Sequence, residues 1–304
     1  MIKSVTVTNY LGDRIKLELA RPELSGFAVV SIDGLGPGKS TINATEVSTV
    51  DGGIFNSARM SARNIVISTM FMRDRSPEDM RHLSYKYFPI KKKVTLLIET
   101  DTRLAEIEGY VESNEPTIFS SFEGSSISII CPDPHFYAAG DGSTNITVFQ
   151  GVIDLFEFPF SNESLTENLL EISTIERETQ RVVVYEGDGE IGITIKIHAL
   201  GEATNITIWN IDTRESMSIN TDKLASSTGS GIKDNDQIVI CTVKGKKSIN
   251  LIRDNESINI LNCLDKNVSW FKLVKGDNVF AYTAETGIEN LQFSIENKIV
   301  YEGV

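Results

Sequence analysis

The pattern of apolar and polar positions changes abruptly around residues 33–64. Two apolar runs, Phe27–Ile32 and Ile65–Phe71, are typical of buried strands and bracket this polar stretch, which is rich in Gly, Ser and Thr. It carries too little apolar surface to offset the entropy lost on ordering it, so it cannot form a core of its own. Residues Thr41–Val50 alternate loosely, which allows a strand or hairpin there. Two interpretations stay open: an arm that is buried against a neighbouring subunit, or an ordinary mobile surface loop.

The remainder of the first 138 residues predicts a mostly β domain with one helix. Alternation at Ile2–Thr8 and at Ile15–Leu19 predicts a hairpin. Pro77 at the first helical position, after Ser76 as N-cap, predicts a helix over about residues 77–88 that Pro89 ends. Further strands are expected at Val94–Glu99, Leu104–Glu112 and Ile127–Cys131.

After a small polar linker at residues 139–144, the pattern changes to many short β runs with turn residues between them. Almost no helical periodicity is present in residues 145–304. Short strands at near-regular spacing indicate an antiparallel sandwich or jelly roll. The fold class expected for the whole chain is therefore mainly β, with two domains.

Composition narrows the class of function. The 304 residues carry a net charge of −13, most of it in the second domain, which disfavours a broad nucleic-acid footprint. Three scattered cysteines without paired spacing favour a reducing compartment over a disulfide framework. No apolar run reaches the length of a membrane span, so no membrane insertion is expected, and the first residues resemble a strand rather than a signal peptide.

One glycine-rich segment suggests a phosphate loop but departs from that motif. Gly34–Ser40 follows a strand and ends in Gly-Lys-Ser, yet Asp33 stands where the first glycine of the motif is required. The following residues, Thr41–Thr45, are β-branched and polar where a helix N-terminus should receive the phosphate. Nucleotide binding is therefore not expected.

Other candidate chemistry is equally weak. Cys131, Asp133 and His135 are ligand-type residues at a spacing of two, but the interleaved prolines favour a stiff connection between domains with a half-buried cysteine. Glu99 and Asp101 are a conceivable glycosidase pair, although acidic residues at a strand-to-turn junction are usually just solvated. We predict no catalytic residue, no metal ligand and no cofactor-binding residue, and we expect the chain not to be an enzyme.

Several strings nevertheless resemble one family, in order along nearly the whole chain. They are dense in residues 26–137 and looser after about residue 145. They include Gly26-Phe27, Ile32–Gly36, Asp51–Ser57, Arg63–Ile67, Tyr85–Lys92, Gly109–Phe119, Cys131–Tyr137, Gly245–Ser248, Trp270 with Leu273, and Gly276–Tyr282. In these strings the chain resembles the siphophage distal tail protein (Dit) family, which also occurs in prophages and phage-tail-like particles.

The resemblance implies a structural protein of the virion tail tip or baseplate, synthesised in the bacterial host cytoplasm. It implies an N-terminal β domain with one helix, six copies of which close into a ring, and a belt or arm that locks the ring. It implies a galectin-like C-terminal β-sandwich outside the ring. The expected partners are the tail tube protein, the tail hub or tail-associated protein and receptor-binding proteins, with DNA passing through the channel without specific binding.

The polar stretch of residues 33–64 occupies the position of the family's belt, so it supplies the candidate interface between subunits. The candidate residues are Gly34, Leu35, Gly36, Ile42, Val47, Gly52, Gly53, Phe55, Asn56 and Arg59. The alternative function is a carbohydrate-binding module for the host envelope, because Trp209 and Trp270 could stack on sugars. A cell-wall hydrolase is a third possibility that no motif supports.

Overall fold

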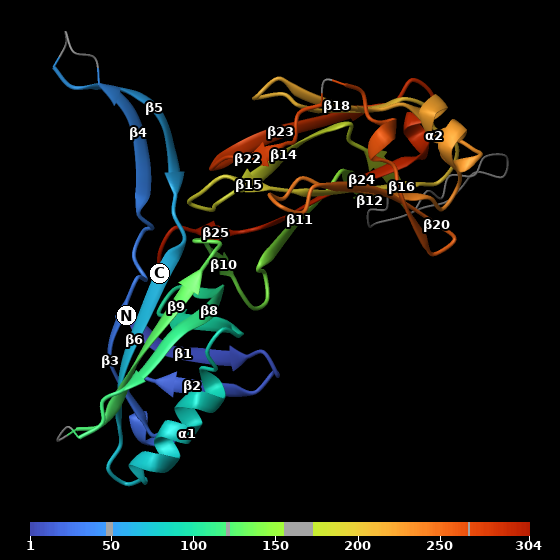
Figure 1. Cartoon of the computed structure of the whole chain (residues 1–304). Coiled ribbons are helices and arrows are strands. Elements are labelled where there is room, and N and C mark those ends of the chain that lie inside the picture. The colour runs from blue at the N-terminus through green and yellow to red at the C-terminus, as the bar shows by residue number, and fades with distance from the viewer. Residues whose placement is uncertain (47–50, 120–121, 155–172, 267) are drawn as a thin grey trace. The chain divides into compact units, whose positions relative to one another are not determined.

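The computed structural model describes residues 1–46, 51–119, 122–154, 173–266 and 268–304. The chain divides into an N-terminal unit, Met1–Ser143 with Val300–Val304, and a C-terminal unit, Thr144–Ile299 (Figure 1). Each unit is described by itself. The prediction of a mainly β fold is confirmed, because antiparallel sheets dominate both units.

A nine-stranded antiparallel sheet forms the N-terminal unit, with the strand order β2-β1-β7-β8-β9-β6-β3; β10 also pairs with β8, and β25 pairs with β10. The longer strands mostly arise from period-2 sequences; in β6, for example, Ile65 and Ile67 are fully buried on one face. The strands are β1 (Ile2–Asn9), β2 (Arg14–Glu18), β3 (Phe27–Asp33), β6 (Arg63–Phe71), β7 (Lys93–Thr100), β8 (Leu104–Pro116), β9 (Gly124–Cys131), β10 (Phe136–Ala138) and β25 (Val300–Tyr301).

Helix α1 (Pro77–Tyr87) contacts β1 and β8 of this sheet. It matches the predicted helix, with Pro77 in the first turn and Phe88 as C-cap. Met80 and Phe88 are buried in the core, which also contains Val7, Leu17 and Leu96. Ser76 is the N-cap residue, but its side chain makes no capping hydrogen bond. The start of the helix therefore depends on the fixed φ of proline and on acidic residues in the first turn.

The C-terminal unit is an antiparallel sandwich, as predicted, although its galectin-like character stays a prediction. Tyr282 of β23 stacks on Phe293 of β24 with ring centroids 4.0 Å apart, which joins the two sheets. The six-stranded sheet contains β11 (Thr144–Val148), β24 (Leu291–Lys298), β16 (Thr194–Ala199), β19 (Gln237–Cys241), β20 (Ser248–Arg253) and β21 (Glu256–Asn259). The four-stranded sheet contains β14 (Gln180–Tyr185), β23 (Gly276–Thr283), β17 (Ile206–Asn210) and β18 (Glu215–Ile219).

Short elements complete this unit. One of them, helix α2 (Thr221–Thr228), was not predicted. Two strand pairs are separate from the main sheets: β12 (Gln150–Asp154) with β13 (Ser173–Arg177), and β15 (Ile191–Gly192) with β22 (Lys272–Leu273). Three-residue 3-10 helices occur at Leu261–Cys263 and Ile288–Asn290 of this unit, and another at Pro22–Leu24 of the N-terminal unit.

The division between the units differs from the predicted one at two places. The N-terminal unit extends to Ser143, and it also includes Val300–Val304, which the sequence analysis assigned to the sandwich. The segment after Cys131 is not a connection between domains, because Phe136–Ala138 pairs with β8 inside the N-terminal sheet. Cys131 is fully buried rather than half-buried.

Candidate functional site

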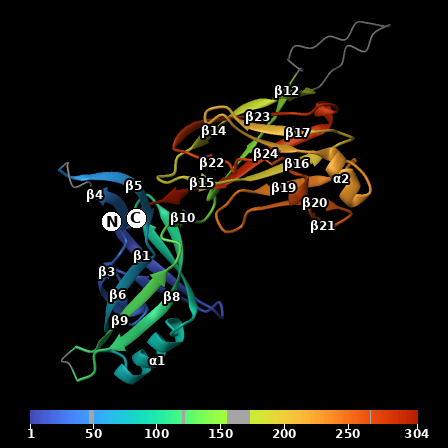
Figure 2. The same ribbon diagram turned by 45° about the horizontal axis from the view of Figure 1, so that its top comes forward.

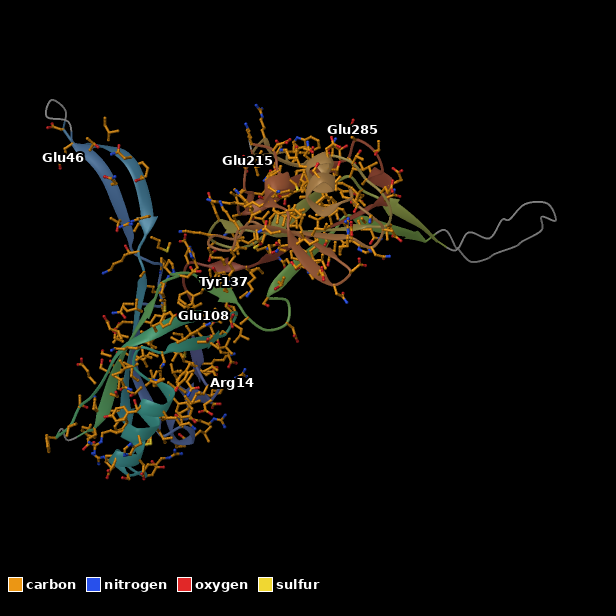
Figure 3. All side chains as sticks on the ribbon, turned by 45° about the vertical axis from the view of Figure 1, so that its right-hand side comes forward. Arg14, Glu46, Glu108, Tyr137, Glu215 and Glu285 are labelled. Atoms are coloured by element: carbon orange, nitrogen blue, oxygen red, sulfur yellow. The ribbon has the colours of Figure 1, made fainter. Side chains whose placement is uncertain are left out.

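The polar stretch between β3 and β6 forms a two-stranded ribbon that leaves the sheet. Strands β4 (Ser40–Glu46) and β5 (Gly53–Met60) pair only with each other, and neither contains a buried residue. Figures 1 and 2 show the ribbon extending beyond the sheet from β3 and β6, and Figure 3 shows Glu46 near its far end. We call residues 34–62 the arm. The hairpin that the sequence allowed is therefore present in the described residues, while burial of the arm against a neighbouring subunit stays a prediction.

The register of the ribbon separates apolar from polar side chains. Ile42 lies opposite Ala58, and Ala44 lies opposite Phe55, so these four side chains share one face. Ile42 is 67% exposed and Phe55 is 63% exposed, and we call this surface the apolar face. Isolated large apolar side chains are common on protein surfaces, but a face of them on a ribbon with no core is typical of an interaction site.

The opposite face of the ribbon is mainly polar. A β-bulge at Asn56 shifts the register, and its side-chain amide donates a hydrogen bond to the Thr45 hydroxyl at 2.6 Å. Arg59 lies opposite Thr41 on this face. Ile54, which is 62% exposed, is a large apolar side chain on the polar face. The bulge therefore keeps Phe55 aligned with Ile42 while Asn56 faces the other way.

The remaining predicted interface residues lie at the two ends of the arm. Gly34 and Leu35 belong to the base, where Leu35 is buried in the N-terminal core. Gly34 has a φ of +88°, and a Cβ there would lie 2.1 Å from the carbonyl oxygen of Asn64, so only glycine fits. Gly52 is exposed at the tip and Gly53 begins β5, while Val47 lies outside the described residues.

The base of the arm also shows why the Gly-Lys-Ser sequence does not act as a phosphate loop. Strand β4 follows it, where a phosphate site requires a helix N-terminus. The carbonyl oxygens of Gly34 and Gly36 accept hydrogen bonds from the guanidinium of Arg63. Arg63 was missed by sequence reasoning. It is buried, which lowers its pKa from the ordinary value, and no local motif distinguishes it from a surface arginine.

The candidate glycosidase pair lies at an exposed network of ion pairs. Glu99 accepts a hydrogen bond from the Ser4 hydroxyl at 2.8 Å and lies 3.3 Å from the Lys16 ammonium group. These two contacts lower the pKa of Glu99 below its ordinary value. A general acid requires a raised pKa, so this environment opposes that role. Asp101 lies 3.6 Å from the Lys3 ammonium group and belongs to the same network.

A second cluster surrounds Asp133 in the segment after β9. The Tyr137 hydroxyl donates to the Asp133 carboxylate at 2.6 Å, and Nδ1 of His135 lies 2.8 Å from it. Burial raises the pKa of Asp133, but the hydrogen bonds from His135 and Tyr137 outweigh it and bring the pKa to about 2. Burial raises the pKa of the Cys131 thiol to about 11, which makes it a poor nucleophile.

Two further features bear on the sequence predictions. No group of three His, Cys, Asp or Glu side chains suited to a metal ion occurs in the described residues. The helices in that same part of the chain are all too short or too polar to cross a membrane.

The two tryptophans lie at the surface of the C-terminal unit. Trp209 alternates with buried residues on β17 and is half-buried on the outer face of the four-stranded sheet, opposite Ala281 and Ser216. The ammonium group of Lys247 lies 5.2 Å from the ring centroid of Trp270. Neither tryptophan belongs to the main core, although Phe271 beside Trp270 does.

Comparison with solved structures identifies the architecture. The crystal structure of the SPP1 Dit protein, described as a paradigm of the hub adsorption apparatus in phages that infect Gram-positive bacteria, is 13% identical to this chain. The similarity covers 97% of this chain and 98% of the SPP1 chain, with a TM-score of 0.63. The chain has the fold of Dit.

The Dit fold therefore extends over both units rather than over one of them. Two structures of the phage P2 baseplate in its activated conformation, with Ca and with Sr, are also 13% identical and cover 98% and 97% of this chain. They cover 99% and 98% of their own chains, with TM-scores of 0.47 and 0.44. No protein-family profile and no curated protein sequence matches the chain.

Proposed function

We propose that this chain is a structural hub protein of a phage tail tip and that it acts by assembly rather than by catalysis. The observation that carries the proposal is the arm: an ordered ribbon with one exposed apolar face, on a chain with the Dit fold over nearly its whole length. A two-stranded ribbon without a core is only marginally stable by itself, so a partner that covers its apolar face would explain why this surface is apolar.

The partner of the arm is a second copy of this chain. If each arm reaches the next copy in the same way, the contact is head-to-tail, and a rotation that closes gives a ring. We propose six copies, as the resemblance to the distal tail family implies. Burial of the Ile42 and Phe55 side chains contributes about 1.5–3 kcal/mol each at every contact, so the arm adds appreciably to ring stability.

The ring would join the tail tube to the tail hub or tail-associated protein and would offer a place for receptor-binding proteins. In this proposal the chain is made in the bacterial cytoplasm and works at the tail tip. DNA passes through the ring without specific binding, since the net charge of −13 provides no excess of cations to hold phosphates.

The test is the mass in solution, measured by light scattering on the full chain and on two variants. Phe55→Ser removes an anchor of the apolar face, whereas Ile54→Ser removes a neighbouring side chain of similar exposure from the polar face. We expect a particle of about 200 kDa for the unchanged chain, six times its mass of 33.6 kDa. We expect Phe55→Ser to shift the population to smaller species and Ile54→Ser to keep the ring.

If Phe55→Ser and Ile54→Ser change the particle mass equally, the apolar face does not hold the ring together. If the unchanged chain is a monomer, the proposed ring does not form in solution. Circular dichroism on both variants checks that each is folded.

A second candidate is attachment to an envelope carbohydrate through the C-terminal unit. It is favoured by the half-buried Trp209 ring, which lies on a sheet face beside a row of hydroxyls, with the Thr207 and Ser218 hydroxyls 2.9 Å apart. A glycan array with the full chain tests it. Specific binding that Trp209→Ala abolishes would support this function, and an array without signal would argue against it.

A further inference from the structure

Five residues that follow the sandwich return to the N-terminal unit. Strand β24 of the sandwich ends at Lys298, and β25 begins at Val300. In β25, Val300 lies opposite Tyr137 and Tyr301 lies opposite Phe136 of β10. Residues 300–304 are therefore bound to the sheet of the N-terminal unit by a strand of their own, and Val300 is almost fully buried.

These residues, which we call the tail, also contact the base of the arm. The backbone amide of Val304 donates a hydrogen bond to the carbonyl oxygen of Leu35 at 3.0 Å. A Cβ added at Gly303 would lie 3.1 Å from backbone atoms of Leu35, Gly36 and Pro37. The two backbones are thus packed so closely that a side chain at residue 303 would force them apart.

Arg63 joins the tail, the arm and the sheet through one guanidinium group. Its Nη2 donates to the carbonyl oxygen of Glu302 at 2.7 Å, and its Nη1 donates to the carbonyl oxygens of Gly34 and Gly36. Its Nε donates to the carbonyl oxygen of Pro134 at 2.7 Å. The planar fork of arginine suits such a junction, because its donors point in fixed directions toward several acceptors.

Two cation–π contacts add to the hydrogen bonds at this junction. The Arg63 guanidinium lies 4.6 Å from the ring centroid of Phe136, and the Arg103 guanidinium lies 4.3 Å from that of Tyr301. Arg63 is 5% exposed. Loss of the tail would leave a buried cation with one acceptor fewer and would open the base of the arm to water.

From these contacts we propose that the tail and Arg63 form a latch that fixes the base of the arm and so sets the direction in which the arm projects. The latch itself rests on contacts within the N-terminal unit. Its importance for assembly rests on the proposed function, because a ring requires every arm to reach its neighbour at the same angle.

The experiment measures the arm's direction with a pair of spin labels in the full chain. One label is on Ser57→Cys in the arm, and the other is on Arg14→Cys, which is exposed on β2 of the same unit (Figure 3). Cys241→Ser removes the half-buried native thiol, and Phe55→Ser keeps the arm from binding a neighbouring copy. The width of the distance distribution then reports how firmly the base is held.

Two latch variants and one control decide the outcome. Gly303→Leu forces a side chain against the arm base, and deletion of residues 300–304 removes the tail altogether. Lys39→Ala is the control, because it removes an exposed side chain from the same base that takes no part in the latch. We expect the distribution to become about twofold broader in both latch variants and to stay unchanged in the control.

Unchanged widths in both latch variants would overturn the latch. The masses of the same variants with Phe55 restored separate this result from the proposed function. If the width increases while the ring mass is kept, the latch stands and the role of the arm in the ring fails. If the ring dissociates while the width is unchanged, the latch fails and the proposed function stands.

Discussion

At the scale of single residues, the neighbours that matter are remote in sequence. The partners of Arg63 are carbonyl oxygens of residues 34, 36, 134 and 302, and a backbone carbonyl has no sequence signature. Sequence reasoning placed Gly34 correctly at the start of the arm stretch but had no means to find the cation that binds it. It placed Cys131 correctly at the end of a strand but expected it to be half-buried, because the prolines that follow suggested a connection between domains rather than a further strand of the same sheet.

Asp133 gives a prediction of pH dependence. Its pKa is about 2 in the folded chain against 3.8 as the ordinary value, so the carboxylate stabilises the fold above pH 3.8. This stabilisation is lost as the pH falls toward 2. Asp133→Asn should therefore lower the melting temperature by about 1–3 °C at pH 6 and by clearly less at pH 2, a modest effect because the side chain is half-exposed.

Scanning calorimetry between pH 2 and 7 measures the difference between the two chains. Asp141→Asn, in the exposed turn after β10, is the control for replacing one exposed carboxylate by an amide. If the melting temperatures of Asp133→Asn and the unchanged chain differ by the same amount at every pH, this explanation is wrong.

At the scale of elements, a helix could be predicted from the sequence when it was long enough to show a period or when residues such as proline marked its ends. Helix α1 was predictable because Pro77 and Pro89 mark its ends. Helix α2 was missed although its caps are regular: Asn220 accepts a hydrogen bond from the amide of Lys223, and Gly229 has a φ of +79°. With eight residues, it is too short to show a helical period, and a search for caps alone would have found it.

The docking of α1 on the sheet gives a second prediction. The buried Asn114 on β8 donates to the Ser84 hydroxyl of α1 at 2.9 Å and accepts from the Ser125 hydroxyl of β9. Asn114→Ala leaves both hydroxyls without this partner in a buried site, so we expect a loss of about 1–3 kcal/mol in the free energy of unfolding. Urea denaturation measures it.

The matched control for this change is Asn64→Ala. Asn64 also accepts a hydrogen bond from a serine hydroxyl, that of Ser128 at 3.0 Å, but on the exposed face. It should cost less than about 0.5 kcal/mol. Equal losses for the two variants would show that burial of the Asn114 network is not what stabilises the helix.

At the scale of the whole molecule, the mainly β class and the two-part organisation followed from the spacing of short strands. The exact division did not, because β25 is two residues long and has no periodicity to read. The arm could be located from its unusual Gly-, Ser- and Thr-rich composition. Its bulge, and therefore its apolar face, could be recognised only from the pairing register of β4 and β5.

The return of the tail makes the sandwich an insertion within the N-terminal domain rather than an appendage after it. Tyr137 lies opposite Val300, so the two points where the chain leaves and re-enters the sheet are adjacent. A chain that joins residue 143 to residue 300 through a few Gly and Ser residues should fold, and it should melt at a higher temperature than one that stops at residue 143. Equal melting temperatures would contradict this topology.

For protein engineering, the same topology turns residues 144–299 into an exchangeable cassette. Any domain whose own ends lie close together could be grafted between the same two strands, with both junctions anchored by one sheet. A domain attached at residue 143 alone would be joined to the sheet by one connection, and the sheet would lack β25.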